Sequence, residues 1–150
     1  MGKKPERSET EKYLQQMKYM DRLIKCKLQE IAELEEVAVS LGVHTEGERV
    51  QTSNCSDKTS ECAIRLADLK REATELCRQW AQLKTEVNRV LNHMSTRQYM
   101  IILNMYFCRN KTFGEIADFM GFSYQWTYQL YKRALAEFEN TRNEIGSCEH

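Results

Sequence analysis

The sequence predicts an all-helical protein in which a long antiparallel helical hairpin is followed by a domain of three short helices. Two observations support this fold class. Apolar residues recur at alternating steps of three and four along two long stretches, which is the heptad pattern of helices that pack on one another. The single proline, Pro5, lies close to the start of the sequence, so no later helix is interrupted by proline chemistry.

A first long helix is expected to begin near Ser8, after a loose tail of residues 1–10. Ser8 and Glu11 have the spacing of a capping box, in which each side chain accepts a hydrogen bond from a backbone N–H. The heptad positions that follow are Met17, Met20, Ile24, Lys27, Ile31, Leu34, Ala38 and Leu41. Lys27 is the polar member, either an edge-exposed lysine or a residue that sets the register. Gly42 is expected to end the helix.

A second long helix is expected after a polar loop. Residues from about 43 to 57 are rich in polar and small side chains and show no helical period. The second heptad series contains no polar member: Leu66, Leu69, Ala73, Leu76, Trp80, Leu83, Val87, Val90 and Met94. Residues 11–94 should therefore fold back as a hairpin. Its two apolar faces either cover each other or pair with a second copy, which would make a homodimer.

Three short helices are predicted over residues 95–139, and residues 140–150 are expected to form a C-terminal tail. The segments Ser95–Gln98 and Thr112–Glu115 have capping-box spacing and open the first two helices. Ser123 is a suitable N-cap for the third. The residues expected on the inner side of the second short helix are Ile116, Ala117, Phe119 and Met120.

The segment Phe113–Leu130 has the spacing of a helix-turn-helix. Ala117 is the small residue needed where the two helices cross, and Gly121 can adopt the positive φ of the turn without steric cost. The apolar anchors of the second helix are Met120, Phe122 and Leu130. Thr127 replaces the usual branched aliphatic residue and places a hydroxyl group against the core.

The third short helix is expected to turn a surface without carboxylates to the solvent. Amide side chains can bind adenine edges bidentately, and basic residues one turn further on can contact phosphates. The residues expected to face the bases of double-stranded DNA are Tyr124, Gln125, Tyr128 and Gln129. Those expected to contact the DNA backbone are Arg97, Arg109, Lys111, Ser123, Lys132 and Arg133.

From Ser95 to about Phe138 the chain resembles region 4 of the sigma-70 family. The segments that carry the resemblance are Leu103–Phe107, Thr112–Ala117, Gly121–Ser123 and Tyr131–Leu135. With the long helices before it, the layout is similar to phage and prophage late-gene transcriptional regulators of the ArpU/RinA type. This resemblance implies a recognition helix in the major groove of a promoter element like the −35 box, and RNA polymerase as a further partner. No segment resembles the promoter-melting region 2, so a complete sigma factor is not expected.

The charge balance limits how this chain can bind DNA. The formal net charge is zero, so contact with the phosphates must be local. One copy would neutralise about three to five phosphates, which corresponds to a salt slope of about −3 to −4. We therefore expect a second copy or RNA polymerase to add affinity.

Other classes of protein are disfavoured. The apolar run Met100–Leu103 is too short to cross a bilayer and no secretory signal is found, so a cytoplasmic location is expected. The six cysteines and three histidines lack the spacing of a zinc site, and no metal or other cofactor is expected. No phosphate-binding loop or Cys/His pair supports catalysis, so the chain is not expected to be an enzyme.

Two alternative functions remain open at this point. A small terminase-like DNA-packaging adaptor also joins a helix-turn-helix to helical oligomerisation segments. A coiled-coil protein-interaction module would use the same helices without binding DNA. The target DNA sequence, and the choice between activation and repression, are not determined by the sequence.

Overall fold

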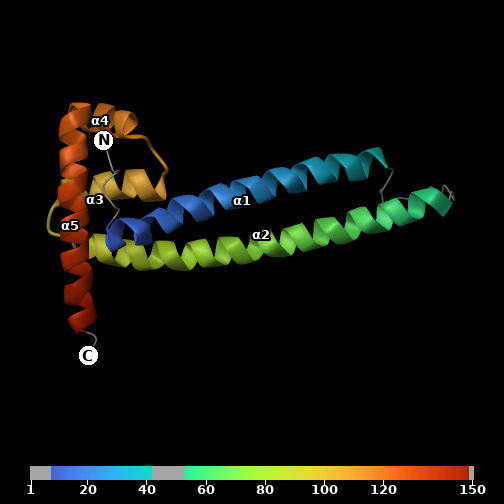
Figure 1. Ribbon diagram of the computed structural model, residues 1–150, viewed down its shortest axis with the longest axis horizontal. Coiled ribbons are helices and arrows are strands. Elements are labelled where there is room, and N and C mark those ends of the chain that lie inside the picture. The colour runs from blue at the N-terminus through green and yellow to red at the C-terminus, as the bar shows by residue number, and fades with distance from the viewer. Residues whose placement is uncertain (1–7, 42–52, 149–150) are drawn as a thin grey trace, which may run out of the picture. The chain divides into compact units, whose positions relative to one another are not determined.

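The computed structural model describes residues 8–41 and 53–148, with side chains described for 8–41 and 58–147. Over these residues the chain is all-helical and contains no strand, which confirms the all-helical part of the predicted fold class. The elements are α1 (Glu9–Ser40), α2 (Ser53–His93), α3 (Arg97–Leu103), the π-helical segment η1 (Asn104–Cys108), α4 (Phe113–Met120) and α5 (Tyr124–Cys148), as Figure 1 shows. Within the described ranges, no helix is long and apolar enough to span a membrane.

α1 starts near Ser8 as predicted, so the predicted tail of residues 1–10 is wrong at positions 9 and 10, and the start of α2 also differs from its prediction. The Glu11 N–H donates to Ser8 Oγ at 3.2 Å, as expected for an N-cap. The expected stop at Gly42 and most of the loop lie outside the described residues. The loop was predicted to extend to about residue 57, but α2 already begins at Ser53, so that part of the prediction is wrong. A polar segment suits a first helical turn because the backbone N–H groups there have no partner within the helix.

The contacts divide the chain into two compact units, and the division differs from the predicted one. One unit comprises residues 20–79, and the other comprises the described residues up to Tyr19 and from Trp80 onward. The heptad pattern ends at residue 94 and predicted the boundary there. The ends of both long helices instead belong to the unit that contains α3, α4 and α5, because they supply part of its core.

Within residues 20–79, α1 and α2 run side by side in opposite directions (Figure 1). Lys27 Nζ lies 2.8 Å from Glu72 Oε2, and Lys70 Nζ lies 3.2 Å from Glu35 Oε1. The polar heptad position is thus held in an ion pair across the two helices, and the hydrogen bond with Glu72 raises the pKa of Lys27. A small apolar core lies between the helices and is formed by Ile31, Leu69 and Ala73, flanked by Leu34 and Leu66.

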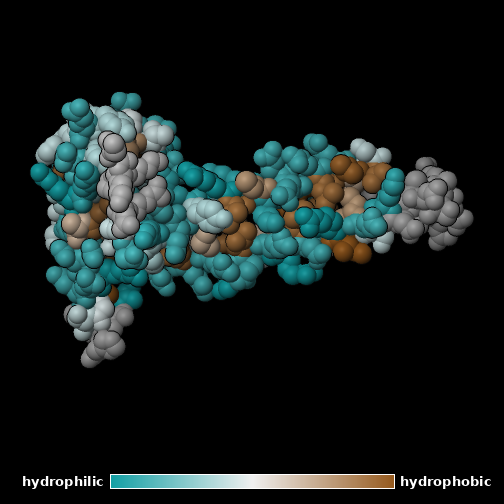
Figure 2. Space-filling model, viewed as in Figure 1, coloured by the Kyte–Doolittle hydropathy of each residue, from teal (hydrophilic) through white to brown (hydrophobic). Residues whose placement is uncertain are grey.

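The surface of this two-helix unit is mixed. Figure 2 shows apolar side chains among mostly hydrophilic ones along it. The large apolar side chains of this unit that are exposed are Leu28, Val37, Val39 and Ile64. Scattered exposed apolar residues are ordinary on protein surfaces, whereas a contiguous patch would mark an interface.

The other unit contains the main core, to which both long helices contribute. Leu14 and Met17 come from α1, Val87, Val90 and Leu91 come from α2, and Met94 directly follows α2. They pack with buried residues of the later elements: Ile102, Leu103, Phe107, Ile116, Leu130, Tyr131, Ala134, Leu135 and Phe138. Residues 95–139 alone therefore lack a complete core.

The predicted C-terminal tail is wrong over its described part, because α5 continues to Cys148. Thr141 is buried and its hydroxyl donates to the Glu137 carbonyl oxygen at 2.8 Å. The Arg142 guanidinium lies 3.8 Å from the centre of the Tyr13 ring, and Ile145 packs against the main core. These contacts with α1 and the core hold a segment whose composition alone does not favour a helix.

The predicted capping box at Ser95–Gln98 is also wrong. The N-cap of α3 is Thr96, and its side chain makes no capping hydrogen bond. Glu137 Oε1 on α5 accepts instead from the N–H groups of Ser95 at 3.2 Å and Thr96 at 3.3 Å. A carboxylate at a helix N-terminus is favoured by the unpaired N–H groups and by the helix dipole. A residue 41 positions away thus replaces the local cap.

We predict that Glu137→Ala lowers the free energy of unfolding by about 1–3 kcal/mol, because the Ser95 and Thr96 donors lose a charged acceptor. Glu137→Gln keeps an acceptor oxygen and should cost less. Urea unfolding followed by circular dichroism measures both. The exposed Glu139→Ala is the matched control on the same helix. Equal stabilities for the Ala variants at 137 and 139 would contradict this role of Glu137.

Candidate nucleic-acid interface

α4 begins and packs largely as its sequence predicts. The Glu115 N–H donates to Thr112 Oγ1 at 3.2 Å, which confirms Thr112 as the N-cap. Ile116 and Ala117 are buried in the unit that contains α3, α4 and α5, as expected. Phe119 is 69% exposed, so its predicted inward position is wrong. The reason is geometric, since a helix as short as α4 buries one narrow stripe and Phe119 lies beside it.

The corner between α4 and α5 has the geometry that a tight turn requires. Gly121 has a φ of 72°, in the left-handed region that glycine adopts without steric cost. The Phe122 N–H donates to the Ala117 carbonyl oxygen at 2.9 Å. The Gly121 N–H donates to the Asp118 carbonyl oxygen at 3.4 Å. This pair of bonds is a Schellman closure, which satisfies the last carbonyls of α4 and sets the direction of the chain.

α5 begins with a local cap and a satisfied internal hydroxyl. The Trp126 N–H donates to Ser123 Oγ at 3.1 Å, so Ser123 is the N-cap of the helix, as its spacing predicts. Thr127 is fully buried, and its hydroxyl donates to the Ser123 carbonyl oxygen at 2.9 Å. The hydroxyl expected against the core therefore costs little, because its hydrogen bond stays within the helix.

One side of α5 is buried and the opposite side carries the predicted DNA-contacting residues. The buried side consists of Thr127, Leu130, Tyr131, Ala134, Leu135 and Phe138. The outward face of α5, as the term is used below, consists of the exposed residues Tyr124, Gln125, Tyr128, Gln129, Lys132 and Arg133. It contains no carboxylate, since Glu137 turns to the start of α3. The structure thus brings the four expected base-facing residues together with two expected backbone contacts.

The two tyrosines of the outward face are held by packing against α4. The Phe113 ring meets the Tyr124 ring edge-on at 6.0 Å between centroids, and the Tyr128 ring at 5.6 Å. On its other side Phe113 stacks on Tyr106, with centroids 4.5 Å apart. Such aromatic pairs add stability beyond the area they bury. Tyr124 and Tyr128 are therefore the members of the outward face that α4 holds in place, whereas Gln125 and Gln129 make no hydrogen bond to another described residue.

The cations of the outward face lie against aromatic rings. Lys132 Nζ is 4.7 Å from the centre of the Tyr128 ring, and Arg133 Cζ is 5.4 Å from that of Trp126. Contacts of this kind attract a cation while leaving it accessible to solvent. Trp126, which is 43% exposed, thus supports Arg133 at the edge of the face.

α1 braces the inner side of α5 through residues that the sequence analysis did not single out for this purpose. Tyr131 is buried, and its hydroxyl donates to Glu11 Oε1 at 3.2 Å. Burial and the neighbouring Glu11 charge raise the pKa of Tyr131. Lys18 Nζ lies 3.4 Å from the centre of the Tyr106 ring. These contacts cross more than 80 residues of sequence, so no local pattern could have revealed them.

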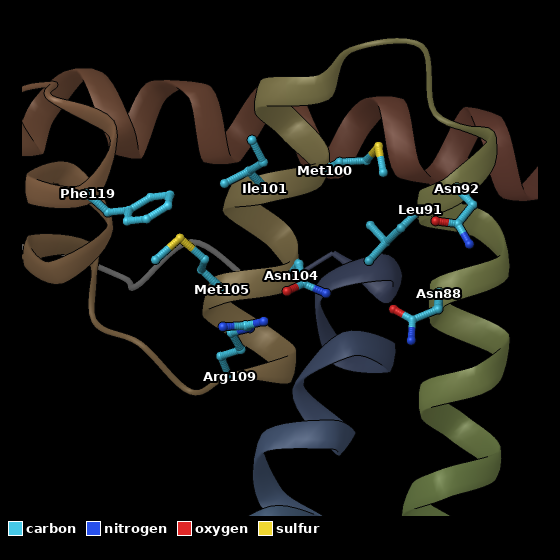
Figure 3. A pocket seen from close by; sticks show the side chains of 9 residues that line it. All are labelled: Asn88, Leu91, Asn92, Met100, Ile101, Asn104, Met105, Arg109 and Phe119. Atoms are coloured by element: carbon cyan, nitrogen blue, oxygen red, sulfur yellow. The ribbon is translucent and has the colours of Figure 1, made fainter.

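Of the other predicted backbone contacts, Ser123 is exposed directly before the outward face, whereas Arg97, Arg109 and Lys111 are dispersed. Arg97 is exposed at the first residue of α3. Lys111 Nζ lies 3.7 Å from Glu115 Oε2, which offsets part of its charge. Arg109 lines a hollow whose other lining residues come from α2, α3, η1 and α4 and not from α5 (Figure 3). The structure therefore does not bring Arg109 together with the outward face of α5.

Metal-ligating residues do not gather in the part of the chain that the structure describes. No group of three or more His, Cys, Asp or Glu side chains there could hold an ion. The cysteines at positions 26, 62, 77 and 108 carry free thiols. Burial raises the pKa of Cys108, which makes this thiol less reactive.

We predict that Gly121→Ala lowers the free energy of unfolding by about 1–2 kcal/mol. An added Cβ would meet nothing within 4 Å, so the cost comes from the positive φ alone. Gly121→Asn should recover part of the loss, since asparagine tolerates this conformation. The matched control is Gly146→Ala inside α5, where a Cβ also meets nothing within 4 Å and a gain of about 0.5–1 kcal/mol is expected. A Gly121→Ala variant as stable as the parent in thermal unfolding would refute the strained corner.

The feature of the described residues that most directly suggests a ligand is the outward face of α5, with its two amides, its two cations and no carboxylate. No protein-family model, curated protein or solved structure matches this chain.

Proposed function

We propose that the chain is a sequence-specific DNA-binding transcriptional regulator, encoded by a phage or prophage, that acts in the cytoplasm without catalysis. In this proposal α4, the Gly121 corner and α5 form a helix-turn-helix like that of sigma region 4. The single observation that carries the proposal is the outward face of α5, where exposed amides and cations stand together with no acidic residue.

The chemistry of this face favours DNA over a protein partner. Gln125 and Gln129 are one helical turn apart and can each donate to and accept from an adenine edge in the major groove. Lys132 and Arg133 follow one turn later, where phosphates border the groove. Tyr124 and Tyr128 are held edge-on by Phe113 and can contact thymine methyl groups or the sugar backbone.

The long helices provide a second means of binding in this proposal. We take α1 and α2 as a heptad hairpin that either pairs with a second copy or extends toward RNA polymerase. Two cations on the outward face give one copy few phosphate contacts, so a second copy or polymerase would raise the affinity. The exposed residues Leu28, Val37, Val39 and Ile64 are available to such a contact.

We predict that Gln125→Ala and Gln129→Ala each weaken binding to the cognate site by about tenfold or more, because each removes a bidentate contact worth about 1–3 kcal/mol. The site is first obtained by selection from random duplex DNA with the full chain, and affinities are then measured by mobility shift. Gln98→Ala, an exposed glutamine on α3, is the matched control. Unchanged affinity and specificity in both α5 variants would exclude these residues as readers.

Experiments with the same full chain and the same random duplex DNA distinguish the alternative functions. Absence of any selected or non-specific duplex binding would favour the protein-interaction module. Light scattering that shows a large ring would favour the packaging adaptor, whereas a monomer or dimer agrees with a regulator.

We predict a modest salt dependence, with a slope of log K against log salt of about −2 to −3 for each bound copy. Lys132, Arg133 and Arg97 are the contacts counted, since Arg109 faces the hollow and Lys111 is paired. Lys132→Ala and Arg133→Ala should each reduce the slope by about one. Arg71→Ala, 77% exposed in the two-helix unit, is the control. A slope that neither α5 variant changes would contradict phosphate contact by this face.

A further inference from the structure

A hollow of about 350 Å³ lies between α2, α3, η1 and α4, on the unit that contains α5 (Figure 3). Its apolar lining consists of Leu91, Met100, Ile101, Met105 and Phe119. Phe119 is 69% exposed and Ile101 is 38% exposed, although both are large apolar side chains. Their position at this hollow means that a bound apolar group would remove them from water.

The polar lining is rich in donors and contains no acid. It consists of Asn88, Asn92, Asn104 and Arg109. Among the described residues, no hydrogen bond or ion pair joins any of these four side chains to another residue. Figure 3 shows the Asn104 amide between the Arg109 guanidinium and the Asn88 amide. A guanidinium with neighbouring amides suits an anion, above all a planar carboxylate that can accept two parallel hydrogen bonds.

The backbone at the hollow is irregular, which is a separate observation. The π-helical segment η1 supplies Asn104 and Met105, and Arg109 follows it directly. The Arg109 N–H donates to the Asn104 carbonyl oxygen at 3.1 Å, which closes the wide turn. π-Helical turns are rare and occur frequently at functional sites. Here the wide turn places an amide, a thioether and a guanidinium around one space.

We propose that this hollow is a binding site for a small aromatic carboxylate. The volume lies within the range of small-molecule sites, and a mainly apolar lining with a few convergent polar groups is typical of them. An aromatic body is favoured because Met100, Met105 and Phe119 offer sulfur and ring contacts. The carboxylate would bind Arg109 and Asn104. The proposal is independent of DNA binding, because no residue of the outward face of α5 lines the hollow.

The test uses 2-naphthoate as the probe and the full chain without DNA. Isothermal titration calorimetry should show saturable binding, and the methyl NMR signals of Ile101, Met100 and Met105 should shift. Arg109→Ala should weaken binding by about tenfold or more, since it removes a charge-assisted hydrogen-bonded pair. The matched control, Arg71→Ala, also removes an exposed arginine and should bind like the parent. The neutral analogue 2-naphthalenemethanol should bind to the parent more weakly than 2-naphthoate does. Its affinity should be the same for the parent and for Arg109→Ala.

Several outcomes would overturn the proposal. One is the absence of saturable binding up to about 1 mM, where a complex would have only marginal affinity. Another is equal binding of 2-naphthoate and the alcohol to the parent, or binding of 2-naphthoate that Arg109→Ala leaves unchanged. Methyl shifts confined to other parts of the chain would also exclude this site. Circular dichroism checks that the Arg109→Ala variant is folded, and because Arg109 is exposed we expect no loss of helix.

Discussion

The packing of Tyr106, Phe113 and Tyr131 is the constraint on which the direction of α5 depends. These rings come from η1, α4 and α5, and their centroids lie within about 5 Å of one another. Tyr131 is tied to α1 by its hydrogen bond to Glu11, while Tyr106 lies under the Lys18 ammonium group. The exposed half of α5 is thus oriented by an aromatic core that the first helix completes. A helix held in this way can present side chains with little further ordering on binding.

The same arrangement gives α4 two separate uses. Through Phe113 it supports the two tyrosines of the outward face of α5, and through Phe119 it contributes to the hollow shared with α2, α3 and η1. The two surfaces differ in chemistry, because one is polar and cationic whereas the other is largely apolar with a single guanidinium. They also share no residue, so a ligand at one surface does not compete directly with a ligand at the other.

Prediction from the sequence succeeded where the partner of a residue lies within one helical turn. The caps at Ser8, Thr112 and Ser123 and the positive φ at Gly121 all follow from hydrogen bonds or sterics between near neighbours. It failed where the partner is remote. The start of α3 is capped from α5 by Glu137, and α5 continues beyond residue 139 because Arg142 and Ile145 contact α1 and the core. Local pattern cannot report such partners, since their positions depend on the whole fold.

The sequence by itself determined the all-helical class, the two heptad stretches of the long helices and the outward position of Gln125 and Gln129, because helical periodicity sets which side of a helix is apolar. Only the tertiary structure decided that the helix ends complete the main core, that Arg109 and Phe119 meet at a hollow, and that the tyrosines of α5 rest on Phe113. These features arise from contacts between elements distant in sequence. Side-chain packing in three dimensions selects such contacts, and no spacing along the chain encodes them.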